Sequence, residues 1–203
     1  KGLLIEEQRT NLVTYSEQFD NAYWLTASGT VTVTANSTTA PDGTVTADFI
    51  IPSASSAFHR IYSPDLGILT ASYSIFVKAG GYSKVALRES ATQGSYISFN
   101  LATGTIIESA NVGTGTVSNA SIVSFGNGWY RISGYFTTLS NNAIGLVVLP
   151  DSYTSGSVNG SWTANGTSGV YAWGAQVEAG SFATSYIPTL ASSVTRSADV
   201  ASV

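Results

Sequence analysis

The sequence has 203 residues, enough for one ordinary domain or two small ones and enough to bury about 70% of the surface of an unfolded chain. Only 10% of the residues are charged, whereas 43% are hydrophobic and about a quarter are Ser or Thr. The net charge is −4 and Lys and Arg do not cluster, which argues against binding to nucleic acid or to an anionic membrane. We therefore expect a surface built from hydroxyl and amide groups.

The chain contains neither Cys nor Met. The lack of Cys excludes disulfides, thiolate metal sites and a Cys nucleophile. Because translation starts with Met, we expect a processed chain or an excised domain that a further segment precedes. The longest apolar stretches, such as residues 144–150, are shorter than the roughly 20 residues that span a bilayer, which predicts a soluble protein.

Apolar and polar residues alternate along most of the chain, which predicts β-strands because successive side chains of a strand point to opposite faces. In chain order the predicted strands are Thr30–Thr34, Tyr73–Lys78, Lys84–Glu89, Tyr96–Leu101, Thr116–Phe125, Trp129–Thr137, Ile144–Leu149 and Val170–Glu178. Turn residues separate them, as in Pro41-Asp42-Gly43 and Gly126-Asn127-Gly128. Only Asp20–Trp24 indicates a helical turn. Short strands at this spacing predict an all-β sandwich or barrel.

The sequence shows no internal repeat and no shift of composition that would divide it. Residues 1–10 are rich in charge and are predicted to form an N-terminal arm. Residues 11–190 are predicted to form the β-sandwich. Residues 191–203 are rich in Ser, Ala and Val and are predicted to be a C-terminal strap or linker.

Patterns for catalysis and for cofactors are weak in this sequence. His59 is the only imidazole, and no Gly-x-Ser-x-Gly elbow accompanies it, so a binding or packing role is favoured over nucleophilic catalysis. The segment Gly80–Lys84 lacks the spacing of a phosphate-binding loop and is interpreted as a turn. Paired carboxylates for glycoside hydrolysis are available but not specific: Glu89, Glu108, Asp151 and Glu178. A calcium ion held by dispersed oxygens stays open, for instance at Asp20, Asp42 or Asp48.

Aromatic residues make up 11% of the chain, and their rings can stack on the C–H faces of sugars. Phe76, Trp129 and Trp173 lie in the middle of predicted strands and are expected in the core. The rings of Tyr82, Tyr153 and Trp162 lie in loops, where packing explains an exposed ring less well.

Three arginines, Arg60, Arg88 and Arg131, are expected to lie inside strands, where they alternate with apolar neighbours. Their side chains are therefore expected to point away from the core. If their strands are neighbours, the three arginines line one face, which would suit a polysaccharide with carboxylates. The predicted ligand-binding set combines these arginines with aromatic residues and the single His: His59, Arg60, Tyr82, Arg88, Tyr96, Arg131, Tyr135 and Trp162.

Several sequence blocks follow one another along the chain: residues 2–11, 11–20 with Trp24, 40–43 with Ala47, 73–80, 128–133, 170–178 and 183–189. Their order resembles that of certain phage virion proteins of tails, head fibres and spikes. The same order is more distantly similar to the family-four, family-nine and family-twenty-two carbohydrate-binding modules.

This resemblance implies a jelly roll of two antiparallel sheets, one of them concave and often able to hold a glycan. Such modules commonly hold a structural calcium between an acidic residue after the first strand and an Asp of the last strand. Asp20 matches the first position, whereas the last strand, Ala172–Ala175, lacks the second Asp.

The favoured hypothesis is a non-catalytic carbohydrate-binding or adhesion module of a phage virion protein, at the virion surface or outside the cell. Its expected partners are a polysaccharide or cell-surface glycan and neighbouring virion modules, with no cofactor required beyond a possible calcium. One alternative is a structural fibre or decoration module whose arms pack on neighbouring subunits. Another is a jelly-roll polysaccharide lyase, in which His59, Arg60 and Tyr82 would act as base, carboxylate neutraliser and acid.

Overall fold

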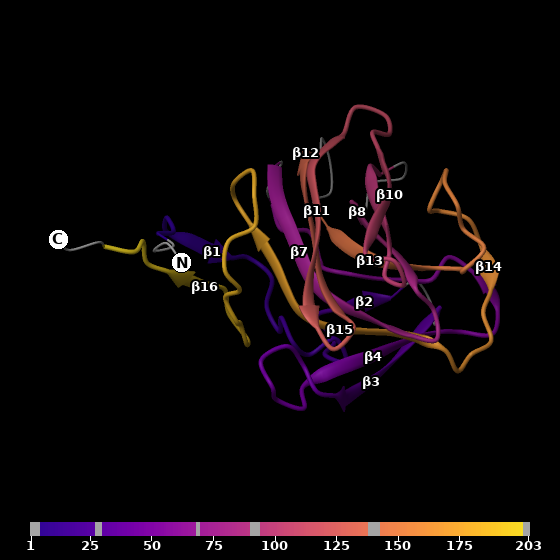
Figure 1. Ribbon diagram of the computed structural model, residues 1–203. Helices are drawn as coiled ribbons and strands as arrows, with labels where there is room; N and C mark the ends of the chain where they lie inside the picture. The colour runs from indigo at the N-terminus through magenta and orange to yellow at the C-terminus, as the bar shows by residue number, and fades with distance from the viewer. Residues whose placement is uncertain (1–4, 27–29, 68–69, 90–93, 138–142, 201–203) are drawn as a thin grey trace.

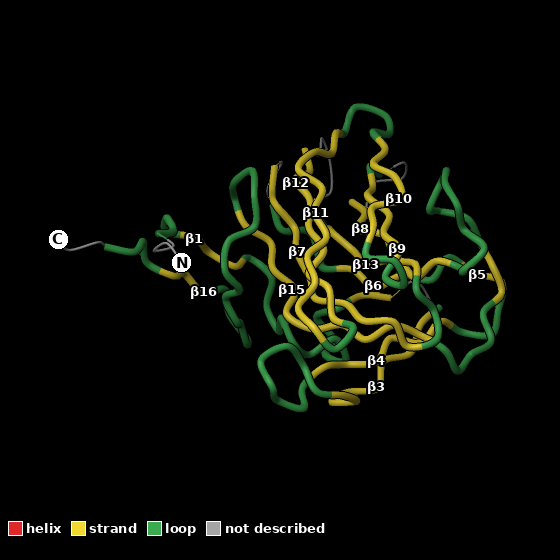
Figure 2. The backbone as a smooth tube through the Cα atoms, in the orientation of Figure 1, coloured by secondary structure: helices red, strands yellow, loops and turns green. Residues whose placement is uncertain are grey.

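The computed structural model describes residues 5–26, 30–67, 70–89, 94–137 and 143–200. The described residues form strands, turns and loops, and they include no helix that could cross a membrane. Strands of two layers face each other, and residues 9–11 and 194–196 lie together at one side of the molecule (Figure 1, Figure 2).

Two six-stranded antiparallel sheets form the layers. Sheet I has the order β10-β9-β8-β13-β6-β2, from β2 (Leu25–Thr26), β6 (Arg60–Tyr62), β8 (Lys84–Glu89), β9 (Tyr96–Asn100), β10 (Thr105–Ala110) and β13 (Ile144–Leu149). Sheet II has the order β11-β12-β7-β15-β4-β3, from β3 (Val31–Thr38), β4 (Ala47–Pro52), β7 (Thr70–Gly80), β11 (Thr116–Gly126), β12 (Trp129–Thr137) and β15 (Gly169–Glu178). Two small sheets pair β1 (Arg9–Asn11) with β16 (Val194–Arg196) and β5 (Ser56–Ala57) with β14 (Trp162–Thr163).

The alternation of side chains builds the core between the two sheets. In β7, Ile75 and Val77 are buried in the main hydrophobic core, and in β8 Val85 and Leu87 join them. Phe76 belongs to a separate cluster on the outer face of sheet II. Hydrophobic burial of this period-two pattern is what holds the two sheets together.

The predicted fold class is confirmed: the chain is an all-β sandwich of two antiparallel sheets. Each predicted strand is present with bounds within a few residues of those expected. Strands of two or three residues, such as β2, β5 and β14, are too short for a periodic pattern to predict. At Asp20–Trp24, where a helical turn was predicted, the chain makes single hydrogen-bonded turns and no longer helix, with Asn21 N donating to Gln18 O and Trp24 N to Asn21 O.

Three aromatic residues expected in the core are buried elsewhere. Phe76, Trp129 and Trp173 are almost fully buried, but they cluster with Ala40 and Ala47 on the outer face of sheet II. The loop of residues 38–46 covers them, since Trp129 Nε1 donates to Thr39 O and Trp173 Nε1 to Thr46 Oγ1. An aromatic residue that is buried in a strand therefore need not point into the core between the two sheets, because a loop can bury it on the outer face.

A bulge in β15 sets which of its side chains face outward. The register with β7 shifts between Trp173 and Gln176, and Gly174 has a φ of 63°. The bulge adds one residue to β15 relative to β7. Trp173 and Gln176 therefore both face outward, whereas Ala172 and Ala175 are buried in the main core. Gly174 suits this position because left-handed backbone conformations strain other residues.

The two arms of the chain pair with each other. Arg9 lies opposite Arg196 in the β1–β16 pair, and an ion pair of 2.6 Å joins Arg196 to Glu6. Further out, Asp199 N donates to Glu6 O and Glu6 N donates to the Asp199 carboxylate. The pair extends away from the sandwich (Figure 1). Whether residues 191–203 act as a strap or linker stays a prediction.

Candidate functional site

An arginine–aromatic ladder lies on the outer face of sheet I; it consists of Phe58, Arg60, Tyr62 and Arg88. The Arg60 guanidinium lies 4.4 Å from the ring centroid of Tyr62 and 5.1 Å from that of Phe58. The Arg88 guanidinium lies 5.6 Å from the Phe58 ring centroid. The ladder therefore alternates cations and rings.

The strand pattern explains why these side chains share a face. Phe58, Arg60 and Tyr62 alternate with His59 and Ile61, both of which are buried. Strand β13 lies between β6 and β8, and its Gly145 pairs with both Tyr62 and Arg88. A Cβ at Gly145 would lie 2.8 Å from the Tyr62 Cβ, so glycine lets the Tyr62 side chain lie across the strand. Residues of the ladder and β13 line a narrow depression there.

The two guanidinium groups of the ladder have different environments. Arg88 is only 4% exposed, and its Nη1 donates to Glu89 O at 2.6 Å. Burial, and then the positive charge of Arg60, lower the pKa of Arg88 to about 10. Arg60 is partly exposed, and no carboxylate or carbonyl of the described residues pairs with its guanidinium, whose buried Nε lacks a partner. Arg60 therefore keeps donors for an external group.

Tyr96 lies on the same sheet face but under a loop, residues 150–160. It is 4% exposed, and its hydroxyl donates to Gly156 O at 2.7 Å. Tyr153 reaches the same carbonyl at 2.7 Å, while Gly156 N donates to Glu108 Oε2. This position leaves Tyr96 almost no surface for a ligand, and its contacts hold the loop against the sheet.

A separate aromatic cluster contains the predicted site residues His59, Tyr82 and Trp162. The ring centroids of His59 and Trp162 are 4.9 Å apart, and those of Tyr82 and Trp162 are 5.0 Å apart. The predicted site residues Tyr82 and Trp162 thus pack on each other and on the main core, although both are partly exposed.

The environment of His59 is that of a structural residue. The residue is 0% exposed, and its ring nitrogens lie 2.6 Å from Thr30 O and 2.9 Å from Trp162 O. Each ring nitrogen thus faces a backbone carbonyl, and which nitrogen donates depends on the tautomer. No surface remains for a ligand, and a general base at His59, as in the lyase alternative, would have neither a free nitrogen nor access to a substrate.

Arg131 and Tyr135 lie on β12 of sheet II, on the opposite side of the sandwich from the ladder. Arg131 Nη2 donates to Ser74 Oγ at 2.8 Å, and the guanidinium lies 5.4 Å from the Phe76 ring centroid. The three arginines were expected to line one face if their strands were neighbours, and this condition is not met: Arg60 and Arg88 share a face of sheet I, whereas Arg131 lies on sheet II. The reason is that β12 belongs to the other sheet.

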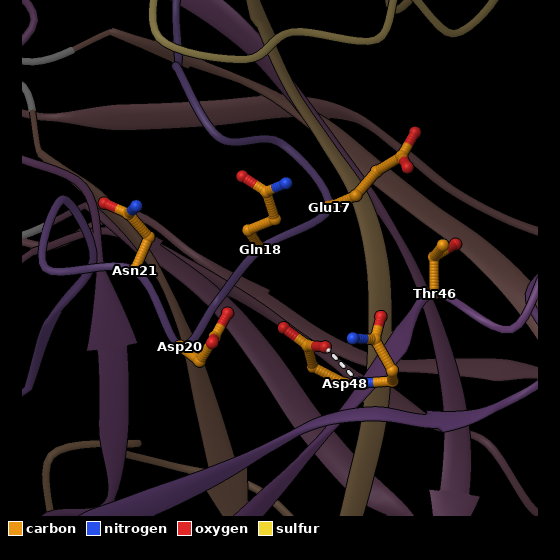
Figure 3. A pocket seen from close by; sticks show the side chains of 7 residues that line it. Glu17, Gln18, Asp20, Asn21, Thr46 and Asp48 are labelled. Atoms are coloured by element: carbon orange, nitrogen blue, oxygen red, sulfur yellow. Dashed lines mark hydrogen bonds between the residues drawn. The ribbon is translucent and has the colours of Figure 1, made fainter.

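An acidic hollow of about 250 Å³ surrounds the predicted calcium residue Asp20. Figure 3 shows Asp20 and Asp48 near each other, whereas Glu17 points away from both. The Asp48 carboxylate accepts bonds from Phe19 N at 2.7 Å and Asn36 N at 2.9 Å. Burial nevertheless raises the pKa of Asp48 to about 6. No three acidic or His side chains of the described residues are grouped so as to hold a metal ion, and calcium at Asp20 stays a prediction.

Phe58 and Tyr62 are the ladder residues that the sequence analysis missed. The signal was present in the segment Phe58-His59-Arg60-Ile61-Tyr62, whose period of two puts both rings on the face of Arg60. A strand of only three residues made that alternation too short to stand out.

The comparisons with known proteins do not assign the chain to a family. No protein-family model matches the sequence, and no curated protein matches it. Among solved structures, the chain is similar to the CBM22-1–GH10 modules of endo-1,4-β-D-xylanase 10B from Clostridium thermocellum, complexed with xylohexaose. The identity is 15% and the TM-score 0.36, over 86% of this chain and 28% of that one. The present chain thus matches little more than a quarter of that protein's length.

Proposed function

We propose that the protein is a non-catalytic module that binds polysaccharide on the outer face of sheet I, at the arginine–aromatic ladder. The observation that carries this proposal is Arg60: its guanidinium is held against the rings of Tyr62 and Phe58 and has no partner among the described residues. A stacked cation with unused donors, on a partly exposed sheet face, is suited to an external ligand.

The chemistry of the ladder fits a sugar polymer. The Tyr62 ring offers an apolar face for the C–H groups of a sugar, and stacking already restricts the rotamers of Arg60. The guanidinium presents several N–H donors in a plane, a geometry that matches a carboxylate in two parallel hydrogen bonds. Arg88 adds a second positive charge beneath the surface. Polysaccharides that carry carboxylates are therefore the favoured ligands.

The biological setting of the module rests on the sequence resemblance alone. We propose that the module belongs to a phage virion protein, at the virion surface or outside the cell, with neighbouring virion modules as partners. In that setting the ladder would attach the particle to a surface glycan.

Arg60→Ala and Tyr62→Ala test the proposal, with Arg9→Ala in the terminal arm as a control of equal charge. Electrophoresis in gels that contain alginate, polygalacturonate or hyaluronate would measure affinity, and dextran and β-glucan would serve as neutral polymers. We expect the wild type to be retarded by at least one acidic polymer, and each ladder variant to bind it about tenfold more weakly. Retardation by none of these polymers, or equal retardation of Arg60→Ala and Arg9→Ala, would contradict the proposal.

A further inference from the structure

A hollow distinct from the acidic hollow lies on sheet II, the sheet opposite the ladder. Its volume is about 400 Å³, within the usual range for small-molecule sites. We call it the turn hollow, because the loop of residues 38–43 and the β11–β12 turn enclose it. The lining residues that could contact a ligand include Thr38, Thr39, Lys78, Phe125, Asn127 and Trp129.

Hydrogen bonds hold the walls of the turn hollow in place. Trp129 Nε1 donates to Thr39 O at 3.0 Å, which ties the loop to β12. Within the loop, Gly43 N donates to Ala40 O, and Asp42 Oδ1 accepts bonds from Thr44 N and its hydroxyl. The Asp42 carboxylate thus bonds within its own turn and does not line the hollow. A ligand would meet a shape that already exists.

The walls combine one exposed ring with one cation. Phe125 is 51% exposed, and its edge-to-face contact with Phe76, at 4.9 Å between centroids, supports the ring from one side. Lys78 is the only charged residue among the described residues of the lining, and its carbon chain passes close to Gly128. The Lys78 ammonium makes no ion pair or hydrogen bond with the described residues.

We infer that the turn hollow is a second saccharide site, for a sugar residue that carries a carboxylate. The C–H face of the sugar would stack on Phe125, and the carboxylate would pair with the Lys78 ammonium. The hydroxyls of Thr38 and Thr39 and the Asn127 amide are the neighbouring polar groups for the sugar hydroxyls. An inorganic anion such as phosphate would use the charge but leave the exposed ring unused.

This site goes beyond the proposed function because none of its residues belongs to the ladder. The ladder lies on the outer face of sheet I, whereas Lys78, Phe125 and Trp129 belong to sheet II. Two sites on opposite faces would let one domain hold two glycan chains, or two parts of one chain, and so raise the overall affinity through multivalency.

NMR titration of ¹⁵N-labelled protein with sodium D-glucuronate tests the inference, with D-glucose as the same ring without the carboxylate. We expect saturable shifts of the amides of Gly126, Asn127 and Gly128 and of the Trp129 indole N–H. Binding of glucuronate is expected in the millimolar range and about fivefold stronger than that of glucose.

Variants separate the contributions of the charge and the ring. Lys78→Met removes the charge at similar length and should abolish the preference for glucuronate, whereas Lys78→Arg should keep it. Phe125→Ala should weaken both sugars about fivefold, whereas Phe182→Ala, an equally exposed ring at 54%, should change neither. Unshifted signals elsewhere in each spectrum would show that the variant is folded.

Three results would overturn the inference: no saturable shift at the turn, an unchanged preference in Lys78→Met, or equal shifts with sodium acetate. The last would mean that the carboxylate alone is bound and the sugar ring is not. Arg60→Ala is expected to leave the shifts at residues 126–129 unchanged, because Arg60 does not line the turn hollow. Failure at the turn hollow and failure at the ladder are therefore seen in different variants.

Discussion

At the scale of single residues, charged and polar groups that sequence reasoning placed in a ligand site often serve the fold instead. His59 is the clearest case, since two backbone carbonyls from separate segments meet its two ring nitrogens. One carbonyl belongs to Thr30, just before β3, and the other to Trp162 in β14. His59 thus joins three parts of the chain at one end of the sandwich.

We expect His59→Phe to lower the free energy of unfolding by about 1–3 kcal/mol, because the phenyl ring keeps an aromatic side chain but offers no N–H to the backbone carbonyls that face it. Urea denaturation would measure the change. His59→Gln can restore one donor and should recover part of the loss. A His59→Phe protein as stable as the wild type would refute the structural role.

Glu89 is a second buried group with a measurable effect. It is 3% exposed, its Oε1 accepts a bond from Ser95 N at 3.0 Å, and its Oε2 has no hydrogen-bond partner. Burial therefore raises the pKa of Glu89 above its ordinary value of 4.5. The folded protein binds this proton more tightly than the unfolded chain does.

It follows that the contribution of Glu89 to stability is fully present below pH 4.5 and is lost as the pH rises above that value. We expect Glu89→Gln, which cannot ionise, to flatten the fall in unfolding free energy between pH 4.5 and 7.5. Glu7→Gln, at an exposed arm position, should leave the slope unchanged. Parallel pH profiles for wild type and Glu89→Gln would show that the carboxyl titrates normally.

At the scale of elements, loops decide which parts of each sheet stay accessible. Residues 150–160 cover one side of sheet I, where Val158 and Tyr153 pack on Tyr96 and Leu149. Residues 38–46 and 181–190 cover much of sheet II, with Gln176 Nε2 donating to Ser185 O and Ile187 N donating to Gln176 Oε1. The ladder lies outside the covered part of sheet I, and the turn hollow lies at the edge of the loop of residues 38–46.

The loop of residues 150–160 depends on one carboxylate. Glu108 Oε2 accepts a bond from Gly156 N at 2.7 Å and lies 3.2 Å from the Tyr96 hydroxyl. We expect Glu108→Gln to speed amide hydrogen exchange in residues 153–160 and to cost about 1 kcal/mol, because a neutral amide oxygen accepts these hydrogen bonds more weakly than a carboxylate oxygen does. Asp199→Asn in the arm is the matched control. Unchanged exchange in the loop would show that Glu108 does not fasten it.

The sequence pattern predicted the bounds of long strands better than those of short ones. Strands β8, β12 and β13 have the predicted bounds because each has at least six residues of alternating or continuous apolar character. By contrast, β6 has three residues and β14 has two, so tertiary hydrogen bonding and not local pattern makes them strands.

At the scale of the whole molecule, the ladder lies on the outer face of sheet I and the turn hollow on sheet II. The two arms of the chain pair with each other. The β1–β16 pair brings residues near the two termini side by side (Figure 1). The exposed apolar side chains of Leu190 and Val194 line one groove together with Pro188. A neighbouring module or subunit packed against the arms, as in the fibre alternative, stays a prediction.

The sequence by itself determined the fold class, most of the long strands and the chemistry of the surface, because period-two alternation and low charge are local properties that folding preserves. Tertiary structure decided which residues meet. It placed Arg131 on the other sheet from Arg60 and Arg88, buried His59 between two carbonyls, and brought Phe125 next to Lys78. Alternation shows that a side chain points to one face of a strand, but only strand order and loop coverage show which face is inner and which outer surface stays open.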